Sequence, residues 1–410
     1  MIAWSTLGMI AAVVLVLATL RHVYAVGHGL NDHAVSVVVL GSMLFYVALL
    51  QEADGLLAAV LVYGQVGIWG LFFSIHRDDA PKKWIRWLLA QPSQLSYAFA
   101  FWGWVFWGLR LPWVLLGSVE LFEPGLWLFP PFALALLGTL NAYLAGFDVR
   151  KHSVQGLPVR MVHLSDLHAS ALMHDAEFKR LVRDVNVLRP ELVLVTGDLV
   201  MPFSEQEHGY LVRALRGIDA PVYCCPGNHD LPILKQLKRQ LERTGIRMLV
   251  DEREVITTSS GALIELTGVD FHWSHARDHL DATMVRLPAA PDGAWRVLLA
   301  HDPRLGRWVP QERFDLVLSG HTHGGQIAGN MFGISFSVLR LLGVRDQGWW
   351  DANGGLHYVH RGNWFTGLPP RMGVAGEIAL LEPMSDAPFV PVEEGEELGE
   401  TPTEEITAAV

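Results

Sequence analysis

The chain has 410 residues, a formal net charge of −11, 51% hydrophobic residues and 18% charged residues. A soluble domain usually carries about a quarter charged residues, so this composition predicts that part of the chain lies in lipid. Two cysteines exclude a disulfide scaffold. The 15 Trp and 18 Phe argue against global disorder. The acidic balance argues against a general nucleic-acid binder, which needs a basic face.

The composition changes near residue 150. Residues 1–150 hold nine of the 15 Trp but only seven of the 31 Lys and Arg residues. Five apolar stretches occur here, each near the ~20 residues that a helix needs to cross a bilayer: Trp4–Leu20, Ala34–Leu50, Gly55–Ile75, Tyr97–Gly117 and Leu126–Phe147. Any one of them could be a buried helix of a soluble protein, but five in succession favour a transmembrane domain over 1–150, with about five helices.

The charges between these stretches predict their orientation. Lys and Arg lie in the loops 21–33 and 76–96 and follow the fifth stretch, whereas 51–54 and 118–124 hold acids and no Lys or Arg. Because positive loops stay in the cytoplasm, we expect a multi-pass protein of the cell (inner) membrane, with residue 1 outside and the C-terminal part inside. Arg110 interrupts the fourth stretch and could snorkel, pair with an acid or bind a lipid head group.

Residues 155–381 have the pattern of a soluble α/β domain. Apolar runs rich in β-branched residues predict buried strands at Val159–Leu164, Leu192–Thr196, Val222–Cys225, Val297–Ala300 and Leu316–Ser319. Helical patterns cover Ala176–Leu188 and Leu231–Arg243, and further short strands are expected within 247–270 and 356–381. Residues 382–410 contain nine acids and no Lys or Arg, which predicts a disordered tail.

Polar clusters follow the five predicted strands. They are Asp166-Leu167-His168, Gly197-Asp198, Gly227-Asn228-His229-Asp230, His301-Asp302 and Gly320-His321-Thr322-His323. Strand side chains alternate, so residues two apart can point to one side where a strand ends. Asp, His and Asn supply the mixed oxygen and nitrogen ligands that suit Mn²⁺, Fe or Zn²⁺ rather than Ca²⁺. One histidine after a strand is usually an ordinary core or surface residue, but five clusters in order favour a metal site.

Together these motifs resemble the calcineurin-like metallophosphoesterases, over roughly 158–381. The extended motif Gly320–Gln326 (GHTHGGQ) is similar to a bacterial subgroup of membrane-associated phosphodiesterases, which includes proteins resembling UDP-2,3-diacylglucosamine diphosphatases. The resemblance implies a sandwich of two β-sheets flanked by helices, with the metals at the strand ends. With the apolar N-terminal region, the expected architecture is a multi-span α-helical membrane domain followed by an α/β metallophosphoesterase sandwich.

The resemblance also implies two divalent ions, expected to be Mn²⁺, with Fe or Zn²⁺ as alternatives. Asp166, His168 and His323 would hold one ion, and Asn228, His301 and His321 would hold the other. Asp198 would bridge the two, and a hydroxide between them would attack the phosphorus. His229 would donate a proton to the leaving oxygen. Asp230 could orient His229 or be a turn residue. The role of Asp302 is left open in the same way.

The predicted function is a membrane-tethered phosphohydrolase that cleaves a phosphodiester or diphosphate bond. The alternative is a non-catalytic membrane receptor or transporter subunit with a vestigial metal domain. A lipid-linked substrate is expected if the apolar segment 331–350 reaches the bilayer, whereas core packing is its other interpretation. The turns 361–364 and 374–378 are expected to line the substrate side. Cys224 and Cys225 are either buried strand residues or an oxidation-sensitive pair.

Overall fold

The computed structural model describes single positions within 95–109 and then, with short gaps, residues 124–384. The described ranges are 124–144, 146–169, 175–201, 208–287, 291–311, 313–331, 334–364 and 371–384. The first three predicted membrane spans, most of the fourth with Arg110, and the tail after residue 384 lie outside them. The chain divides into two compact units, one comprising Met1–Leu144 with Gly367–Arg371 and the other Ala145–Thr366 with Met372–Val410.

In the first unit the described part is mainly helix α6, Pro124–Leu144. Asn141 Nδ2 donates a hydrogen bond of 2.8 Å to the carbonyl of Arg371, whose own N–H donates to the carbonyl of Gly138. A helix is therefore confirmed within the predicted fifth span. Among the described residues, no helix combines the length and the apolar character needed to cross a membrane.

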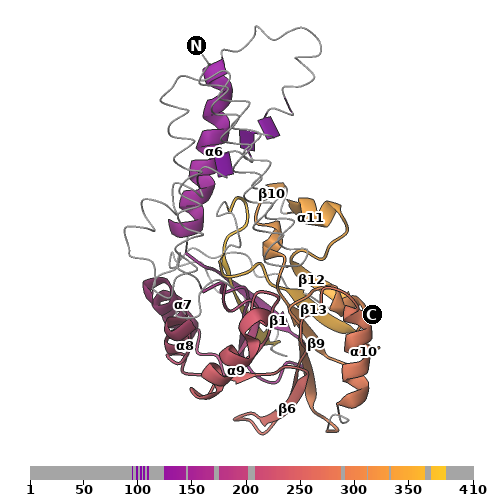
Figure 1. The fold of residues 1–410 in the computed structure, drawn as a ribbon. Helices are drawn as coiled ribbons and strands as arrows, with labels where there is room; N and C mark the ends of the chain where they lie inside the picture. Colours follow the sequence, from indigo (N-terminus) through magenta and orange to yellow (C-terminus); the bar gives the residue numbers. More distant parts are fainter. Residues whose placement is uncertain are drawn as a thin grey trace, which may run out of the picture. The chain divides into compact units, whose positions relative to one another are not determined.

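Two six-stranded mixed sheets form the second unit (Figure 1). The first has the order β1 (Asp148–Val154), β14 (Glu377–Pro383), β2 (Met161–Leu164), β3 (Leu192–Thr196), β4 (Val222–Cys225) and β5 (Arg247–Met248). The second has the order β12 (Gly348–Ala352), β13 (Gly355–Val359), β9 (Leu316–Ser319), β8 (Trp295–Leu299), β7 (Leu263–Gly268) and β6 (Glu252–Thr257). In the first sheet, β2, β3, β4 and β5 pair with their neighbours in parallel. In the second sheet, β7, β8, β9 and β13 do the same. All five predicted strands are confirmed.

Helices cover the outer faces of both sheets. Figure 1 shows α7 (Asp175–Val187), α8 (His208–Leu215) and α9 (Leu234–Glu242) on one side of the strands and α10 (Ala276–Arg286) on the other. Alternate residues of one strand serve different cores: Val162 packs with Phe178 and Leu241 under α7 and α9, whereas Met161 faces Leu266 between the sheets. A third core lies under α10. This is the expected α/β sandwich.

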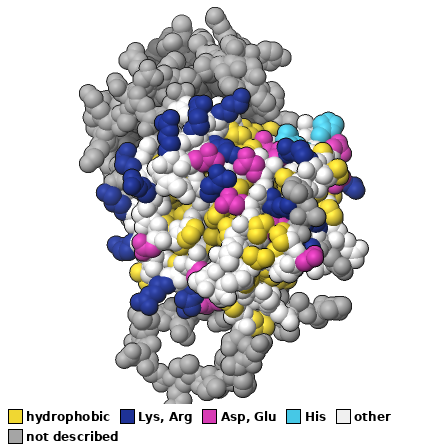
Figure 2. Space-filling model, turned by 90° about the horizontal axis from the view of Figure 1, so that it is seen from below, with side chains coloured by type: hydrophobic (Ala, Val, Ile, Leu, Met, Phe, Trp, Pro, Cys, Tyr) yellow, Lys and Arg dark blue, Asp and Glu magenta, His cyan; other side chains and the backbone are white. Residues whose placement is uncertain are grey.

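One predicted helix consists of two parts. Leu231–Arg243 begins with a 3₁₀ turn, Leu231–Ile233, which is followed by α9. Pro232 stands in the first turn, where its missing N–H removes no helix bond, because the first N–H groups of a helix have no partner within it. Within the described ranges, two further 3₁₀ turns are Leu305–Arg307 and His323–Gly325. On the face shown in Figure 2, hydrophobic side chains form small groups among charged ones, as is usual for a solvated surface.

Strand β1 begins before the expected domain boundary at residue 155. It carries Arg150 and Lys151, which the sequence placed in a loop after the fifth span, and it pairs in parallel with β14. Only His152 and Val154 of its seven side chains are buried, so β1 is an edge strand without an alternating apolar pattern. Glu382 and Pro383, the first residues of the predicted tail, belong to β14.

The segment 331–350 is divided between several elements. It contains the end of hairpin strand β10 (Ala328–Met331), its partner β11 (Ile334–Ser337), helix α11 (Val338–Leu341) and the start of β12. The Trp349 ring packs against His152 and Tyr358. Leu341 and Leu342, by contrast, are 76% and 73% exposed. Packing against other rings therefore describes Trp349 near the end of the segment, whereas an exposed apolar pair stands at the end of α11.

Cys224 and Cys225 are free thiols in β4 and are fully buried. Burial raises the pKa of both thiols well above the ordinary value. Thiolate is the reactive form, so the structure supports the interpretation of two core residues in a buried strand.

Candidate metal centre

The predicted ligands lie at the carboxyl ends of neighbouring strands in both sheets. Asp166 and His168 follow β2, Asp198 follows β3, and Asn228 with His229 follows β4 of the first sheet. His301 follows β8, and His321 and His323 follow β9 of the second sheet. Because parallel strands end at the same edge of a sheet, residues up to 157 positions apart in the sequence meet at one site.

The backbone is strained at these positions. Asp166, His168, Asp198, His321 and His323 have φ values of 57°, 42°, 51°, 73° and 51°. Positive φ is uncommon for residues other than glycine and costs about 1–3 kcal/mol per residue. The motif glycines allow a close approach, since a Cβ on Gly227 would collide with Asp198, and one on Gly320 with Ser165 and Asp166. Five strained residues at one site indicate that the surrounding fold holds these side chains in place for function.

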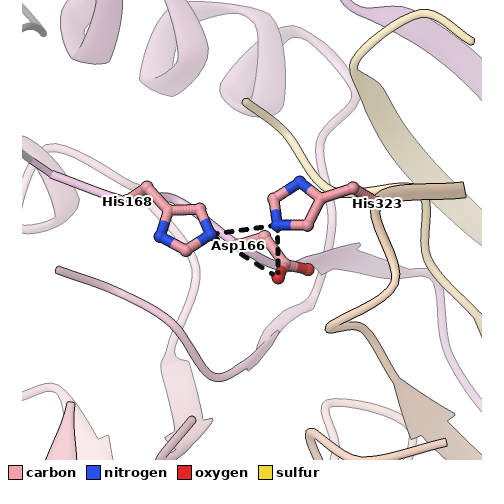
Figure 3. Close-up of side chains that lie close together, drawn as sticks. All are labelled: Asp166, His168 and His323. Carbon is pink, nitrogen blue, oxygen red and sulfur yellow. Dashed lines mark hydrogen bonds and ion pairs between the residues drawn. The ribbon is translucent and has the colours of Figure 1, made fainter. Parts of the chain in front are cut away.

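Asp166, His168 and His323 form the first group of converging ligand atoms (Figure 3). Nε2 of His323 lies 3.2 Å from Oδ1 of Asp166 and 3.0 Å from Nε2 of His168. Nδ1 of His323 donates to the carbonyl of Trp364 at 2.9 Å. This bond leaves the lone pair of His323 on Nε2, directed toward the other two side chains, which is the usual arrangement of a metal-ligating histidine.

Asp198 belongs to two further groups, one with His301 and His321 and one with His168 and His229. Its Oδ2 lies 3.2 Å from Nε2 of His301 and 3.7 Å from Nε2 of His168. Nε2 of His301 is also 3.2 Å from Nδ1 of His321, and Nδ1 of His301 donates to the carbonyl of Thr196 at 2.7 Å. One oxygen of Asp198 therefore faces histidines of both predicted ligand sets.

Asn228 provides an independent test of the metal assignment. Its side chain is buried next to Asp198, whose Oδ1 accepts a 2.9 Å hydrogen bond from the His229 N–H. Within the described part of the chain, Oδ1 of Asn228 has no hydrogen-bond partner. A buried unpaired carbonyl costs about 1–3 kcal/mol, so such an atom calls for an explanation. The donor set of carboxylate, amide and imidazole groups fits divalent ions, which would also coordinate this oxygen.

The protonation of the cluster suits cation binding. Burial lowers the pKa of His321 to about 4 and that of His168 well below its ordinary value, so both imidazoles are neutral at neutral pH, as ligands must be. Burial disfavours charge on His301 too, but the Asp198 carboxylate outweighs it and raises the pKa of His301 to about 10. The Asp198 carboxylate thus favours a positive charge at this position, which a divalent ion bound to the neutral imidazole would supply in place of the proton.

Asp230 holds the backbone of the site rather than the His229 ring. Its buried carboxylate accepts hydrogen bonds from the N–H groups of Gly227, Val200 and Leu199 at 2.8, 3.1 and 3.3 Å. Burial, and then the charge of Asp198, raise the pKa of Asp230 to about 7. Of the two roles left open by the sequence, these bonds fit that of a turn residue, because they tie the turns after β3 and β4 together. Asp302 forms a 2.7 Å ion pair with Arg304.

Sequence analysis missed the contribution of Asn363 and Trp364. Asn363 accepts a hydrogen bond from the N–H of Ser165 at 2.9 Å and donates its own N–H to the Ser165 carbonyl at 2.8 Å. Trp364 accepts from His323. The turn 361–364 thus supports the ligands through the Asn363 side chain and the Trp364 carbonyl. Residues 374–378 likewise include the start of β14, where Glu377 is fully buried.

Residues 159–325 match the family model described as calcineurin-like phosphoesterase. Phosphodiesterase YaeI of Escherichia coli (strain K12) is 30% identical over 192 residues, covering 44% of this chain and 67% of that protein. The chain belongs to the calcineurin-like phosphoesterase family. It is therefore a metal-dependent phosphoesterase with His/Asp sites for divalent ions, and the interpretation as a vestigial domain is set aside.

Two other relatives of this calcineurin-like phosphoesterase extend the comparison. The uncharacterized metallophosphoesterase YkuE of Bacillus subtilis (strain 168) is 28% identical over 230 residues, covering 54% of this chain and 78% of the relative. A "transmembrane protein with metallophosphoesterase domain" from Danio rerio is 28% identical over 255 residues, covering 56% of this chain and 53% of the relative. The similarity reaches both bacterial and vertebrate proteins.

Proposed function

We propose that this phosphoesterase hydrolyses a phosphodiester or diphosphate bond with two divalent ions, Mn²⁺ in the first instance. The observation that carries the proposal is the position of Asp198 Oδ2 between His168 of one ligand set and His301 of the other. A carboxylate oxygen shared in this way suits the bridge of a two-metal site. The relative YaeI is named as a phosphodiesterase, which supports the same reaction class.

The residues of the site would have separate roles in metal binding and proton transfer. Asp166, His168 and His323 would hold one ion, and Asn228, His301 and His321 the other. Bound divalent ions supply a positive field for the phosphate and make water more acidic. His229 is 19% exposed, whereas His168 beside it is buried. It can therefore face an entering substrate and donate a proton to the leaving oxygen.

The proposal includes a membrane tether formed by residues 1–150, with the catalytic unit in the cytoplasm. Its support is the apolar composition and the Lys/Arg asymmetry of that region, together with the description of the Danio rerio relative as a transmembrane protein. We expect a cysteine introduced at the exposed position Asp278 to resist a membrane-impermeant thiol reagent in intact cells and to react after lysis. Labelling of that cysteine from outside would overturn the topology.

A lipid-linked substrate is proposed because the exposed pair Leu341–Leu342 is connected to the metal centre. Thr322, between His321 and His323, donates its hydroxyl to the carbonyl of Asp346 at 2.5 Å. The buried Asp346 carboxylate accepts from Ser337 at 2.6 Å, at the start of α11. Exposed leucines near a site mark contact with partners or lipid. Such a substrate also suits the diacylglucosamine-type diphosphatases that the GHTHGGQ motif resembles.

Replacing Leu341 and Leu342 together by Ser tests this proposal. We expect about a tenfold loss of kcat/KM on a lipid-linked diphosphate in bilayers, which is about 1.4 kcal/mol. Lipid would cover the two leucines only in part, and a fully buried leucine contributes about 1.5–3 kcal/mol. Hydrolysis of a water-soluble diester by the Mn²⁺-loaded protein should stay within about twofold. Val187→Ser, which changes a 72% exposed side chain on α7, is the matched control. Equal losses on both substrates, or no loss on either, would contradict a lipid-binding role for this pair.

A further inference from the structure

Two aromatic residues lie beside the second ligand group on the loop between β7 and α10. The Phe271 ring is buried, with centroids 5.8 Å from the His301 ring and 5.4 Å from the His321 ring. The Trp273 ring lies 4.9 Å from Phe271 and 5.9 Å from His321. Unlike Phe271, Trp273 is 43% exposed. A large apolar surface therefore borders a polar site and is left in contact with solvent.

The burial of the ligands shows from which side a substrate enters. Asp166, His168, Asp198, His301 and His323 are all buried. His229 and His321 are only half-buried. Solvent thus reaches the cluster beside these two histidines, and Trp273 lies at this opening in contact with His321. A phosphate ester bound at the cluster must extend its organic part through the same opening.

The orientation of the indole leaves room for a stacking partner. Trp273 meets Phe271 and His321 at interplanar angles of 78° and 67°, so both contacts are edge-to-face. Among the described residues, no ring is stacked in parallel on the indole. Aromatic rings in such a position can add an offset-stacked partner.

The loop that carries Trp273 is fixed at its base. The N–H of Asp270 donates to Oδ1 of Asp251 at 3.0 Å, and Nε2 of His279 on α10 lies 2.9 Å from the same oxygen. The N–H of Val269 donates to the carbonyl of Leu299 at 3.1 Å. A preorganised loop binds a ligand without the cost of ordering itself.

We propose that Trp273 forms a subsite for a planar aromatic ring, such as an aryl group or a nucleobase, on the alcohol esterified to the substrate phosphate. The ring stacks on the indole while the phosphate lies at the metal cluster. The inference rests on the proposed function, in which this cluster binds phosphate esters. In this proposal, Trp273 makes the protein prefer ring-bearing esters over simple alkyl esters.

Calorimetric binding of phenyl phosphate and methyl phosphate to the full-length Mn²⁺-loaded protein tests the subsite. These ligands share the phosphate and differ in the ring. Trp273→Ala should weaken phenyl phosphate binding about tenfold, within the range measured for a base stacked on an aromatic residue. Methyl phosphate binding should change less than about twofold, and Trp273→Phe should retain most of the preference for phenyl phosphate.

The other outcomes have distinct meanings. If both ligands weaken equally in Trp273→Ala, the residue acts by positioning His321, and the subsite is refuted. If neither ligand weakens, or if the wild-type protein does not prefer phenyl phosphate, no ring binds there. If the wild-type protein with normal metal content neither binds these ligands nor hydrolyses a generic diester, the proposed function itself fails, and the subsite with it.

Discussion

Replacing Asp198 by Ala should release both metal ions and lower turnover of a generic diester by more than about 10³-fold. The side chain is buried, and its Oδ2 is the atom that faces histidines of both ligand groups. Losing the ions removes several kcal/mol of transition-state stabilisation, and each 1.36 kcal/mol is a tenfold change in rate. Elemental analysis of the purified protein, together with the rate of diester hydrolysis, measures both effects.

The control for Asp198→Ala is Asp278→Ala, the same chemical change at a side chain 77% exposed on α10. It should leave metal content and rate unchanged. Retention of one full equivalent of metal by Asp198→Ala would show that this carboxylate binds a single ion and does not bridge two.

His229→Ala should behave differently, with both metals retained and the rate reduced about 10²–10⁴-fold, the contribution of a positioned general acid. The His229 side chain is the most exposed of the His168–Asp198–His229 group, and its Nε2 lies 3.9 Å from Oδ2 of Asp198. Metal analysis and single-turnover rates on the same preparation separate binding from chemistry.

His275→Ala, which removes an imidazole that is 82% exposed, is the control for this substitution. It should change neither the metal content nor the single-turnover rate. If His229→Ala lost one metal equivalent, as expected for a ligand, His229 would be a metal ligand. It would then not be the proton donor to the leaving oxygen.

The strands were predictable because they are buried on both faces. Leu192–Thr196 and Leu316–Ser319 are entirely buried and consist of continuous apolar runs in the sequence, the pattern of parallel strands covered on both sides. The ligands were found for a related reason: each polar motif follows such a run, and parallel strands carry these motifs to one edge. Local pattern and global topology agree at these positions.

Other features had no local pattern to reveal them. Strand β1, with the sequence DVRKHSV, owes its position to pairing with β14, more than 220 residues away in the sequence. Trp364 supports His323 through its backbone carbonyl, a group that every residue carries. The bonds of Asp230 to backbone amides and the contact of Trp273 with His321 depend on how separate loops meet. Tertiary contacts of this kind leave no trace in composition or periodicity.

The division of the ligands between the sheets ties metal loading to the integrity of the sandwich. Away from the strand ends, an apolar layer joins the sheets, with Met161 and Leu194 opposite Leu266 and Leu318. At the strand ends, charged and polar ligands face one another across the interface, and divalent ions would act there as cross-links. Ions that bind only the folded state raise its stability in proportion to the logarithm of their concentration. The melting temperature of the catalytic unit should therefore rise with the concentration of free metal, which reports metal binding without any substrate.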